Sequence, residues 1–323
     1  MIKKTLLALI LPFAGPALAE GILLSSPIDC DLDSGGCYIQ QYMDRDPSAG
    51  VSDYQCQNLS YEGHKGTDFG VPTLSHMQAG VNVIAAAPGK VVGLRDGMPD
   101  VAYTAKAAAQ IKGRECGNGV VLRHQDGWET QYCHLKQGSI AVTKGQQITA
   151  GQVLGLVGQS GRAAFPHVHL SVRKDGKKID PFDPDGTLSC DSPGDSTLWH
   201  KAPSYRPGGL LDVGFAMEIP AYSDVKAGTA KARKISTTAP ALVLFGFAFG
   251  VRKGDIMRLD ITGPSETIIT QDVQYDRNQA QSFRAIGKKR RSVPWPTGDY
   301  VGTATLIRDE QSVSVLRTRI TLR

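Results

Sequence analysis

The sequence predicts an all-β protein with two domains, and three observations support the β class. Short runs rich in β-branched and apolar residues recur along the chain, and Gly, Pro and Asp residues bound them. Two Asp-Gly pairs, at residues 126–127 and 175–176, mark the turns of two β-hairpins. Helical periodicity is absent beyond residue 211. The length of 323 residues corresponds to about two ordinary domains.

The strand-like runs of the first half lead into the two hairpins. They cover residues 81–86, 90–94, 119–124, 128–134, 152–157, 168–173 and 177–180. A long connection, residues 95–117, separates the second and third runs, and its Ala-rich part has the composition of one or two helical turns. Connections of this length in compact domains are often functional.

The second half predicts a linker followed by a small β-sandwich. Residues 186–211 are rich in Pro, Gly and Ser, as is typical of a linker. The strand-like runs beyond it are 241–249, 255–262, 266–273, 299–307 and 312–322. An immunoglobulin-like arrangement is one option for this domain, although the Cys–Trp–Cys pattern of that fold is absent. The apolar run 239–251 predicts one or two buried strands.

The N-terminus has the pattern of a secretory signal peptide over residues 1–19. Lys3 and Lys4 precede a short apolar run, and Ala17-Leu18-Ala19 is a typical cleavage pattern. The apolar run is shorter than the roughly 20 residues that span a bilayer, and no later segment is a better candidate. We therefore expect an exported protein without a transmembrane anchor.

The charge is unevenly distributed along the chain. The apolar share of 41% and the charged share of 21% exclude a disordered polyelectrolyte. Of the net charge of +5, residues 205–323 contribute 18 Lys and Arg against 11 Asp and Glu, a net +7. The sharpest cluster is Lys288-Lys289-Arg290-Arg291. It predicts either a solvated loop or a contact with an anionic wall or envelope polymer, and no nucleic-acid partner is expected.

Six cysteines predict disulfides, because their number is even and the chain is expected in an oxidising compartment. Cys116 and Cys133 lie near the open end of one expected hairpin and should pair. A Cys37–Cys56 bridge would close the loop before the first histidine motif, which leaves Cys30–Cys190 by elimination. Six cysteines allow 15 pairings. This cysteine content favours a periplasmic location over release from the cell.

Four of the seven histidines lie in patterns typical of a metal site. His64 precedes Asp68 by four residues, and His134 ends the first expected hairpin. His167 and His169 alternate with apolar residues, so a strand would point both imidazoles to one face, about 7 Å apart at Cα. Two histidines and one aspartate meet the ligand count of a catalytic zinc site. No His-Glu-x-x-His motif is present, so a histidine must replace the usual glutamate base.

Together these motifs resemble the lysostaphin-type zinc metallo-endopeptidases, which cut peptidoglycan cross-links. The resemblance covers roughly residues 60–184. It rests on residues 63–70, 85–92, 132–135, 151–158 and 166–170. It implies a lysostaphin-like antiparallel β-sheet catalytic domain in which His64, Asp68 and His169 bind one Zn²⁺ per chain. It also implies that His134 and His167 are the catalytic histidines that do not bind zinc.

The expected organisation follows from the motifs and the resemblance. It is a signal peptide (1–19), a loop-rich disulfide-bearing segment (20–59), a zinc metallopeptidase domain (60–185), a linker (186–211) and a basic β-sandwich (212–323). Asp180 is a candidate partner for a ligand histidine.

The expected function is hydrolysis of peptide cross-links of bacterial peptidoglycan by zinc-activated water with histidine assistance. Two alternatives are a non-catalytic regulator or activator of another cell-wall hydrolase and a wall-binding protein that works through its C-terminal domain. The sequence leaves open which bond is cut, D-alanyl-diaminopimelate or glycyl-glycine, and which of His134 and His167 is the general base.

Overall fold

The protein is mostly β, as the sequence predicts. The structure, a computed structural model, describes residues 21–187, 189–190 and 196–323. The expected signal peptide therefore lies outside the described residues. No helix in the described part is long and apolar enough to cross a membrane.

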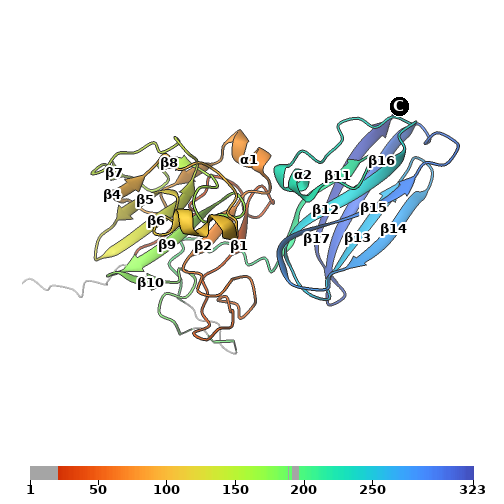
Figure 1. The fold of residues 1–323 in the computed structure, drawn as a ribbon. Coiled ribbons are helices and arrows are strands. Elements are labelled where there is room, and N and C mark those ends of the chain that lie inside the picture. Colours follow the sequence, from red (N-terminus) through yellow and green to blue (C-terminus); the bar gives the residue numbers. More distant parts are fainter. Residues whose placement is uncertain (1–20, 188, 191–195) are drawn as a thin grey trace, which may run out of the picture.

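The first unit is built on an eight-stranded antiparallel sheet (Figure 1). The strand order is β1-β2-β9-β6-β5-β4-β7, and β10 pairs with the free part of β9. The strands are β1 (Tyr38–Gln41), β2 (Thr67–Gly70), β4 (Gly89–Arg95), β5 (Asn118–Arg123), β6 (Trp128–Leu135), β7 (Gln147–Ile148), β9 (His167–Lys174) and β10 (Lys177–Ile179). A separate pair, β3 (Asn82–Ile84) and β8 (Val153–Leu156), packs beside this sheet.

Both Asp-Gly pairs form the expected hairpin turns, one between β5 and β6 and one between β9 and β10. In each turn the Asp and the Gly have positive φ, 53° and 76° at Asp126 and Gly127, as such tight turns require. The Ala-rich part of the long connection forms the 3₁₀ helix Ala105–Ile111.

Other elements differ from the expectation. The runs 81–86 and 152–157 pair with each other as β3 and β8 and do not join the main sheet. Strands β1, β2 and β7 and the helix α1 (Leu74–Ala79) were not expected. These elements have between two and six residues, which is too short for a periodic pattern to be recognised.

The second unit consists of a three-stranded and a four-stranded antiparallel sheet. The strand orders are β11-β12-β15 and β14-β13-β16-β17. The elements are β11 (Gly209–Ala216), α2 (Tyr222–Ala227), β12 (Ala241–Val251), β13 (Ile256–Thr262), β14 (Thr267–Gln274), β15 (Gln279–Lys289), β16 (Gly298–Arg308) and β17 (Gln311–Leu322). Strands β11 and β15 were not expected. The residue boundaries of the two domains stay a prediction.

The strand β12 explains the longest apolar run of the sequence, because it is buried on both faces. Phe245, Phe247 and Phe249 pack into the core of the first unit. The alternate residues Leu242 and Leu244 pack into the core between the two sheets of the second unit. A strand that contributes to two cores reads as a continuous hydrophobic run without alternation.

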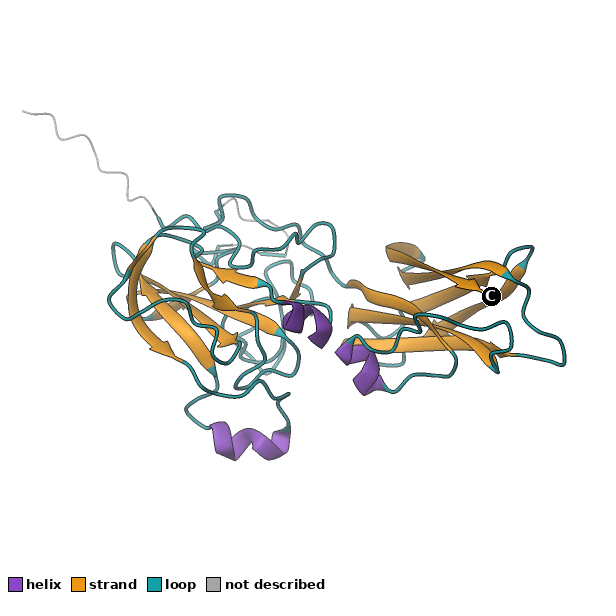
Figure 2. Cartoon of the chain, turned by 90° about the horizontal axis from the view of Figure 1, so that it is seen from above, coloured by secondary structure: helices purple, strands orange, loops and turns teal. Residues whose placement is uncertain are grey.

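The same face of the second unit covers β1, the edge strand of the first. The Tyr38 and Phe249 rings lie 4.6 Å apart between centroids. Gln40 is fully buried and its Nε2 donates a 2.9 Å hydrogen bond to the Ala280 carbonyl. Figure 2 shows α1 and α2 side by side where the units meet, and Ser75 Oγ on α1 donates to the Ala227 carbonyl of α2 at 2.7 Å. The sheet edge is therefore protected from pairing with another chain.

The disulfides agree with the expectation at one of three positions. Cys116–Cys133 is present, whereas the other bridges are Cys30–Cys37 and Cys56–Cys190. The expected Cys37–Cys56 and Cys30–Cys190 pairings are wrong. The chain turns back after Cys30, and the Cys37 N–H donates to the Asp31 carbonyl, which brings these two cysteines together.

The second correction has a cause in aromatic packing. Tyr54 stacks on Phe182 with ring centroids 4.5 Å apart, so the loop that carries Cys56 lies against the segment that follows β10. Contacts between segments so far apart in the chain leave no trace in cysteine spacing. Elimination by sequence order could not find this pairing.

The buried carboxyl of Asp180 should make stability depend on pH. Burial raises the pKa of Asp180 to about 6, with Asp183 and Asp53 adding to the shift, while the Phe182 N–H and Arg45 oppose it. Between pH 4 and 6 the folded chain binds more protons than the unfolded chain, so stability falls as pH rises through this window. We expect Asp180→Asn to remove a penalty of about 2–3 kcal/mol at pH 7.5 and to have little effect near pH 4.

Urea unfolding of both chains at pH 7.5, 6, 5 and 4 measures this difference. The exposed Asp276→Asn is the matched control and should leave the pH dependence of the wild type unchanged. Parallel stability curves for the wild type and Asp180→Asn would contradict the assignment.

Candidate metal centre and active site

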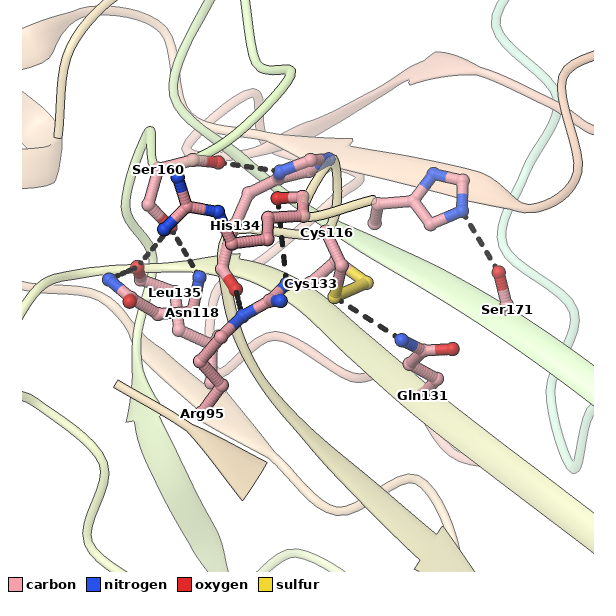
Figure 3. Close-up of a disulfide and its surroundings, with 12 residues drawn as sticks. Arg95, Cys116, Asn118, Gln131, Cys133, His134, Leu135, Ser160 and Ser171 are labelled. Atoms are coloured by element: carbon pink, nitrogen blue, oxygen red, sulfur yellow. Dashed lines mark hydrogen bonds between the residues drawn. A yellow bond between two sulfur atoms is a disulfide. The ribbon is translucent and has the colours of Figure 1, made fainter. Parts of the chain in front are cut away.

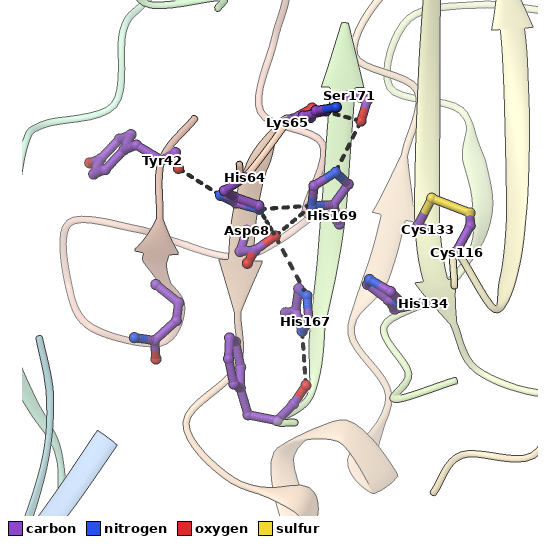
Figure 4. Close-up of polar contacts among 12 residues, drawn as sticks. Tyr42, His64, Lys65, Asp68, Cys116, Cys133, His134, His167, His169 and Ser171 are labelled. Carbon is purple, nitrogen blue, oxygen red and sulfur yellow. Dashed lines mark hydrogen bonds and ion pairs between the residues drawn. A yellow bond between two sulfur atoms is a disulfide. The ribbon is translucent and has the colours of Figure 1, made fainter. Parts of the chain in front are cut away.

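The three expected metal ligands meet across one pair of strands. Asp68 lies on β2 directly opposite His169 on β9, in antiparallel register. His64 lies in the loop just before β2, and its side chain folds back over Asp68 (Figure 4). Among the described residues, these three form the group of His, Cys, Asp and Glu side chains close enough together to hold a metal ion.

The hydrogen bonds around the two histidines determine which ring nitrogens face each other. His64 Nδ1 donates to the Tyr42 carbonyl at 2.6 Å, because a carbonyl oxygen can only accept. Ser171 Oγ donates to the Lys65 carbonyl, so it accepts from His169 Nε2 at 3.0 Å. The neutral rings therefore present the lone pairs of His64 Nε2 and His169 Nδ1 to each other.

When both rings are neutral, this arrangement brings three acceptors together with no proton between them. His64 Nε2 lies 3.1 Å from His169 Nδ1 and 3.2 Å from Asp68 Oδ1, and His169 Nδ1 lies 2.8 Å from Asp68 Oδ1. Tetrahedral zinc with bonds of about 2.0–2.1 Å separates its ligand atoms by about 3.3 Å. A cation relieves the repulsion among these acceptors, and the donor set and spacing fit zinc.

The electrostatics of the site favour an ionised Asp68. Although burial alone would lower it, the pKa of His64 is raised by the Asp68 carboxylate. Although burial alone would raise it, the pKa of Asp68 is held well below its usual range by the neighbouring His64 and His167. Burial lowers the pKa of His169. The side chains of His64 and Asp68 are almost fully buried, so these charges interact in an environment of low dielectric constant.

The other two expected residues lie beside this group. His167 Nδ1 donates to the Phe165 carbonyl at 2.8 Å, and its Nε2 lies 3.5 Å from Asp68 Oδ1. His134 comes from the end of β6, with its ring centroid 4.7 Å from that of His167 and 6.0 Å from that of His169. The structure thus brings all five expected residues into one site (Figure 4).

His134 is held by the backbone of a neighbouring loop (Figure 3). Its Nδ1 donates to the Ser160 carbonyl at 2.7 Å, which leaves Nε2 as the acceptor of the neutral ring. Burial lowers the pKa of His134 well below its usual range, and His167 and His169 add to this shift. A neutral imidazole with a free acceptor nitrogen can take up a proton.

The other histidines that the structure places and the candidate Asp180 lie elsewhere or have another environment. His76 contacts Thr73, and His124 contacts Pro88 and Thr130, away from the site. Asp180 accepts a hydrogen bond from the Phe182 N–H, and the outer ring nitrogens of His64 and His169 bond to other residues, so its expected role is wrong. That role belongs to Tyr42 and Ser171.

Three residues that hold the histidine rings, Tyr42, Ser160 and Ser171, were not predicted from the sequence. Tyr42 and Ser160 act through backbone carbonyls, which any residue carries, so no side-chain pattern could indicate them. Ser171 was open to prediction because it lies two residues beyond His169 on the same face of β9. The Tyr61 ring lies 4.4 Å from the His64 ring between centroids, and Tyr61 is 46% exposed, so it borders the site.

Residues 62–181 match the sequence model of the family described as Peptidase family M23. The chain is 39% identical over 83 residues to the DD-carboxypeptidase/endopeptidase Mpg of Neisseria meningitidis. The matched segment covers 25% of this chain and 19% of Mpg. It is 31% identical over 122 residues to the peptidoglycan DD-endopeptidase ShyB of Vibrio cholerae, covering 38% and 23%.

Among solved structures, the catalytic domain of lysostaphin from Staphylococcus simulans is similar to this chain. It is 25% identical and covers 37% of this chain and 77% of that one, with a TM-score of 0.26. The chain spans about a fifth of the length of the curated relatives it matches. Residues 62–181 form a Peptidase M23 domain of the lysostaphin-like family.

Ser171 should set the metal affinity of the site by holding the His169 ring in one tautomer and orientation. We expect Ser171→Ala to weaken zinc binding about 10- to 100-fold, as is typical when a partner of a ligand histidine is lost. Competition with a chromophoric chelator measures the affinity. The exposed Ser312→Ala is the matched control and should bind zinc like the wild type. Equal affinities for the two variants would refute this role of Ser171.

Proposed function

We propose that this chain is an exported zinc-dependent endopeptidase that hydrolyses peptide cross-links of bacterial peptidoglycan. The observation that carries the proposal is the convergence of His64, Asp68, His134, His167 and His169 in one site of a Peptidase M23 domain. The substrate class comes from the relatives, which are named as peptidoglycan endopeptidases. The described residues form three disulfides, and this supports an oxidising compartment such as the periplasm.

In this proposal, His64 Nε2, Asp68 Oδ1 and His169 Nδ1 hold one zinc ion per chain. Zinc bound there supplies Lewis acidity, which activates water and polarises the carbonyl of the scissile amide. The hydrogen bonds from His64 to Tyr42 and from His169 to Ser171 fix the two rings with their lone pairs towards this position. The protein thereby orients the ligands before the ion binds.

The two remaining histidines provide the proton transfers. Because Nδ1 of His134 donates to Ser160 and Nδ1 of His167 donates to Phe165, both rings have an acceptor Nε2 when neutral. One of these nitrogens takes up a proton as the amide is attacked and passes it to the leaving amine. The other ring, when protonated, donates a hydrogen bond to the developing oxyanion.

The metal assignment predicts the outcome of replacing His169. We expect His169→Ala to lose zinc and to retain less than about 1% of the activity, since transition-state stabilisation at such sites contributes factors of 10² or more. Metal analysis should find about one zinc per wild-type chain. Mass spectrometry of muropeptides after digestion of purified peptidoglycan measures the activity and identifies the bond that is cut.

The exposed His200→Ala is the matched control and should keep both zinc and activity. Full activity of His169→Ala would show that the metal assignment is wrong. A wild-type chain that binds zinc and produces no new peptide termini would instead favour the regulator of another hydrolase.

We also propose that the second unit contacts an anionic wall or envelope polymer. The observations that support this are the net charge of +7 over residues 205–323 and the exposed cluster of Lys288, Lys289 and Arg291 at and beyond the end of β15. Cationic clusters attract polyanions in a salt-dependent manner.

We expect replacement of Lys288, Lys289 and Arg291 by Ala to weaken sacculus binding at low salt several-fold, and by less at 0.5 M salt, where screening is strong. Cosedimentation with sacculi measures binding. The control replaces the exposed Arg317 and Arg319 of β17 by Ala. Equal loss in both variants would indicate a general charge effect, and no loss in either would exclude this cluster as the contact.

A further inference from the structure

The disulfide Cys116–Cys133 lies immediately beside His134 (Figure 3). It links the end of the long 95–117 connection to the strand β6, one residue before the histidine. The expected catalytic roles of the histidines do not involve this disulfide. Its position next to His134 suggests that it helps to position the histidine.

His134 occupies a bulge in β6. Gly119 pairs with Cys133 and Asn118 pairs with Leu135, so His134 is the extra residue on its strand. Its φ of 66° lies in the left-handed region, which is unfavourable for a residue with a Cβ. Such conformations persist only where the surrounding structure determines them strongly, and they cluster at functional sites.

The backbone of His134 is held from the Cys116 side. The His134 N–H donates a 2.8 Å hydrogen bond to the Cys116 carbonyl. Because Cys116 is bonded to Cys133, the residue before His134, this acceptor cannot move away from the bulge. The disulfide and the hydrogen bond together close a small ring that includes the backbone N–H of His134.

The side chain of His134 is held by the same layer of backbone. Ser160, whose carbonyl accepts from His134 Nδ1, has an Oγ that accepts from the Asn118 N–H at 2.9 Å and donates to the Leu135 carbonyl at 2.8 Å. A Cβ at Gly117 would lie 2.5 Å from Ser160 backbone and side-chain atoms, so the two segments pack backbone against backbone. The end of the 95–117 connection thus packs against Ser160, whose carbonyl holds the imidazole.

We infer that the Cys116–Cys133 disulfide is a positioning device for His134: it fixes the left-handed backbone that directs the ring into the zinc site. The inference rests on the proposed function, because it takes His134 as a catalytic group. Zinc is held by other residues, so loss of the bridge should affect turnover and leave the metal site intact. It also assigns a role to the 95–117 connection, which is to carry Cys116.

The test compares Cys116→Ser/Cys133→Ser with the wild type on purified cross-linked muropeptide dimers. We expect kcat to fall about 10- to 100-fold, the size of effect that a displacement of about 1 Å has on a catalytic group. KM and zinc content should stay within a factor of two of the wild type. The control is Cys30→Ser/Cys37→Ser, which removes a disulfide from a different loop and should leave kcat unchanged.

A double-mutant cycle shows whether the bridge acts through His134. If it does, adding Cys116→Ser/Cys133→Ser to His134→Ala should cause no further loss of kcat, because coupled residues are not additive. A purely structural bridge would lower the activity of His134→Ala by the same factor as that of the wild type. If the double Ser variant does not fold by circular dichroism, Cys116→Ala/Cys133→Val, which fills the apolar space, takes its place.

The outcomes separate the two proposals. If the wild type cleaves muropeptides and His134→Ala does not, but the disulfide variant keeps wild-type kcat, only the positioning role is overturned. A loss of zinc in the disulfide variant would also overturn it, since the bridge would then support the metal site. If the wild type cleaves no muropeptide, the proposed function fails and the inference fails with it.

Discussion

The site depends on one constraint: two imidazole lone pairs and a carboxylate oxygen face one another across β2 and β9 within 3.2 Å. When both rings are neutral, no hydrogen bond can join these three acceptors, so the fold must hold them there against their repulsion until a cation compensates it. Antiparallel register fixes Asp68 opposite His169, and backbone or hydroxyl partners fix both rings. The pairing of β2 with β9 is therefore what keeps Asp68 and His169 close enough to hold a metal ion.

The second unit contributes to this support although it contains none of the five site residues. Its strand β12 presents three phenylalanines to the first unit and covers β1, which pairs with β2. Tyr42, the residue after β1, accepts the hydrogen bond of His64 and lies in a cluster of aromatic rings with Tyr54 and Tyr205. The packing between the units thus extends, through β1, to His64, one of the three candidate metal ligands. On the opposite side of the site from Tyr42, the Cys116–Cys133 disulfide lies beside His134 (Figure 4).

The sequence predicted the features that depend on one strand or one tight turn. His167 and His169 share a face of β9 because alternate residues of a strand do, and both Asp-Gly pairs turn the chain because their backbone angles require it. The spacing of His64 and Asp68 could be recognised, but their approach to His169 depends on pairing between strands 100 residues apart. Tyr42 and Ser160 act through carbonyl groups, which every residue has, so no sequence pattern could reveal them.

The sequence by itself determined the all-β class, the two hairpins and the Cys116–Cys133 bridge, which arise from local periodicity, turn chemistry and short spacings. The roles of the five candidate site residues come from the family resemblance and stay a prediction. Only the tertiary structure decided the other two disulfides, the covering of β1 by the second unit, the left-handed conformation of His134 and the partners of the ligand rings. Each of these depends on which distant segments pack together, and that is set by the burial of whole faces, which residue spacing along the chain does not encode.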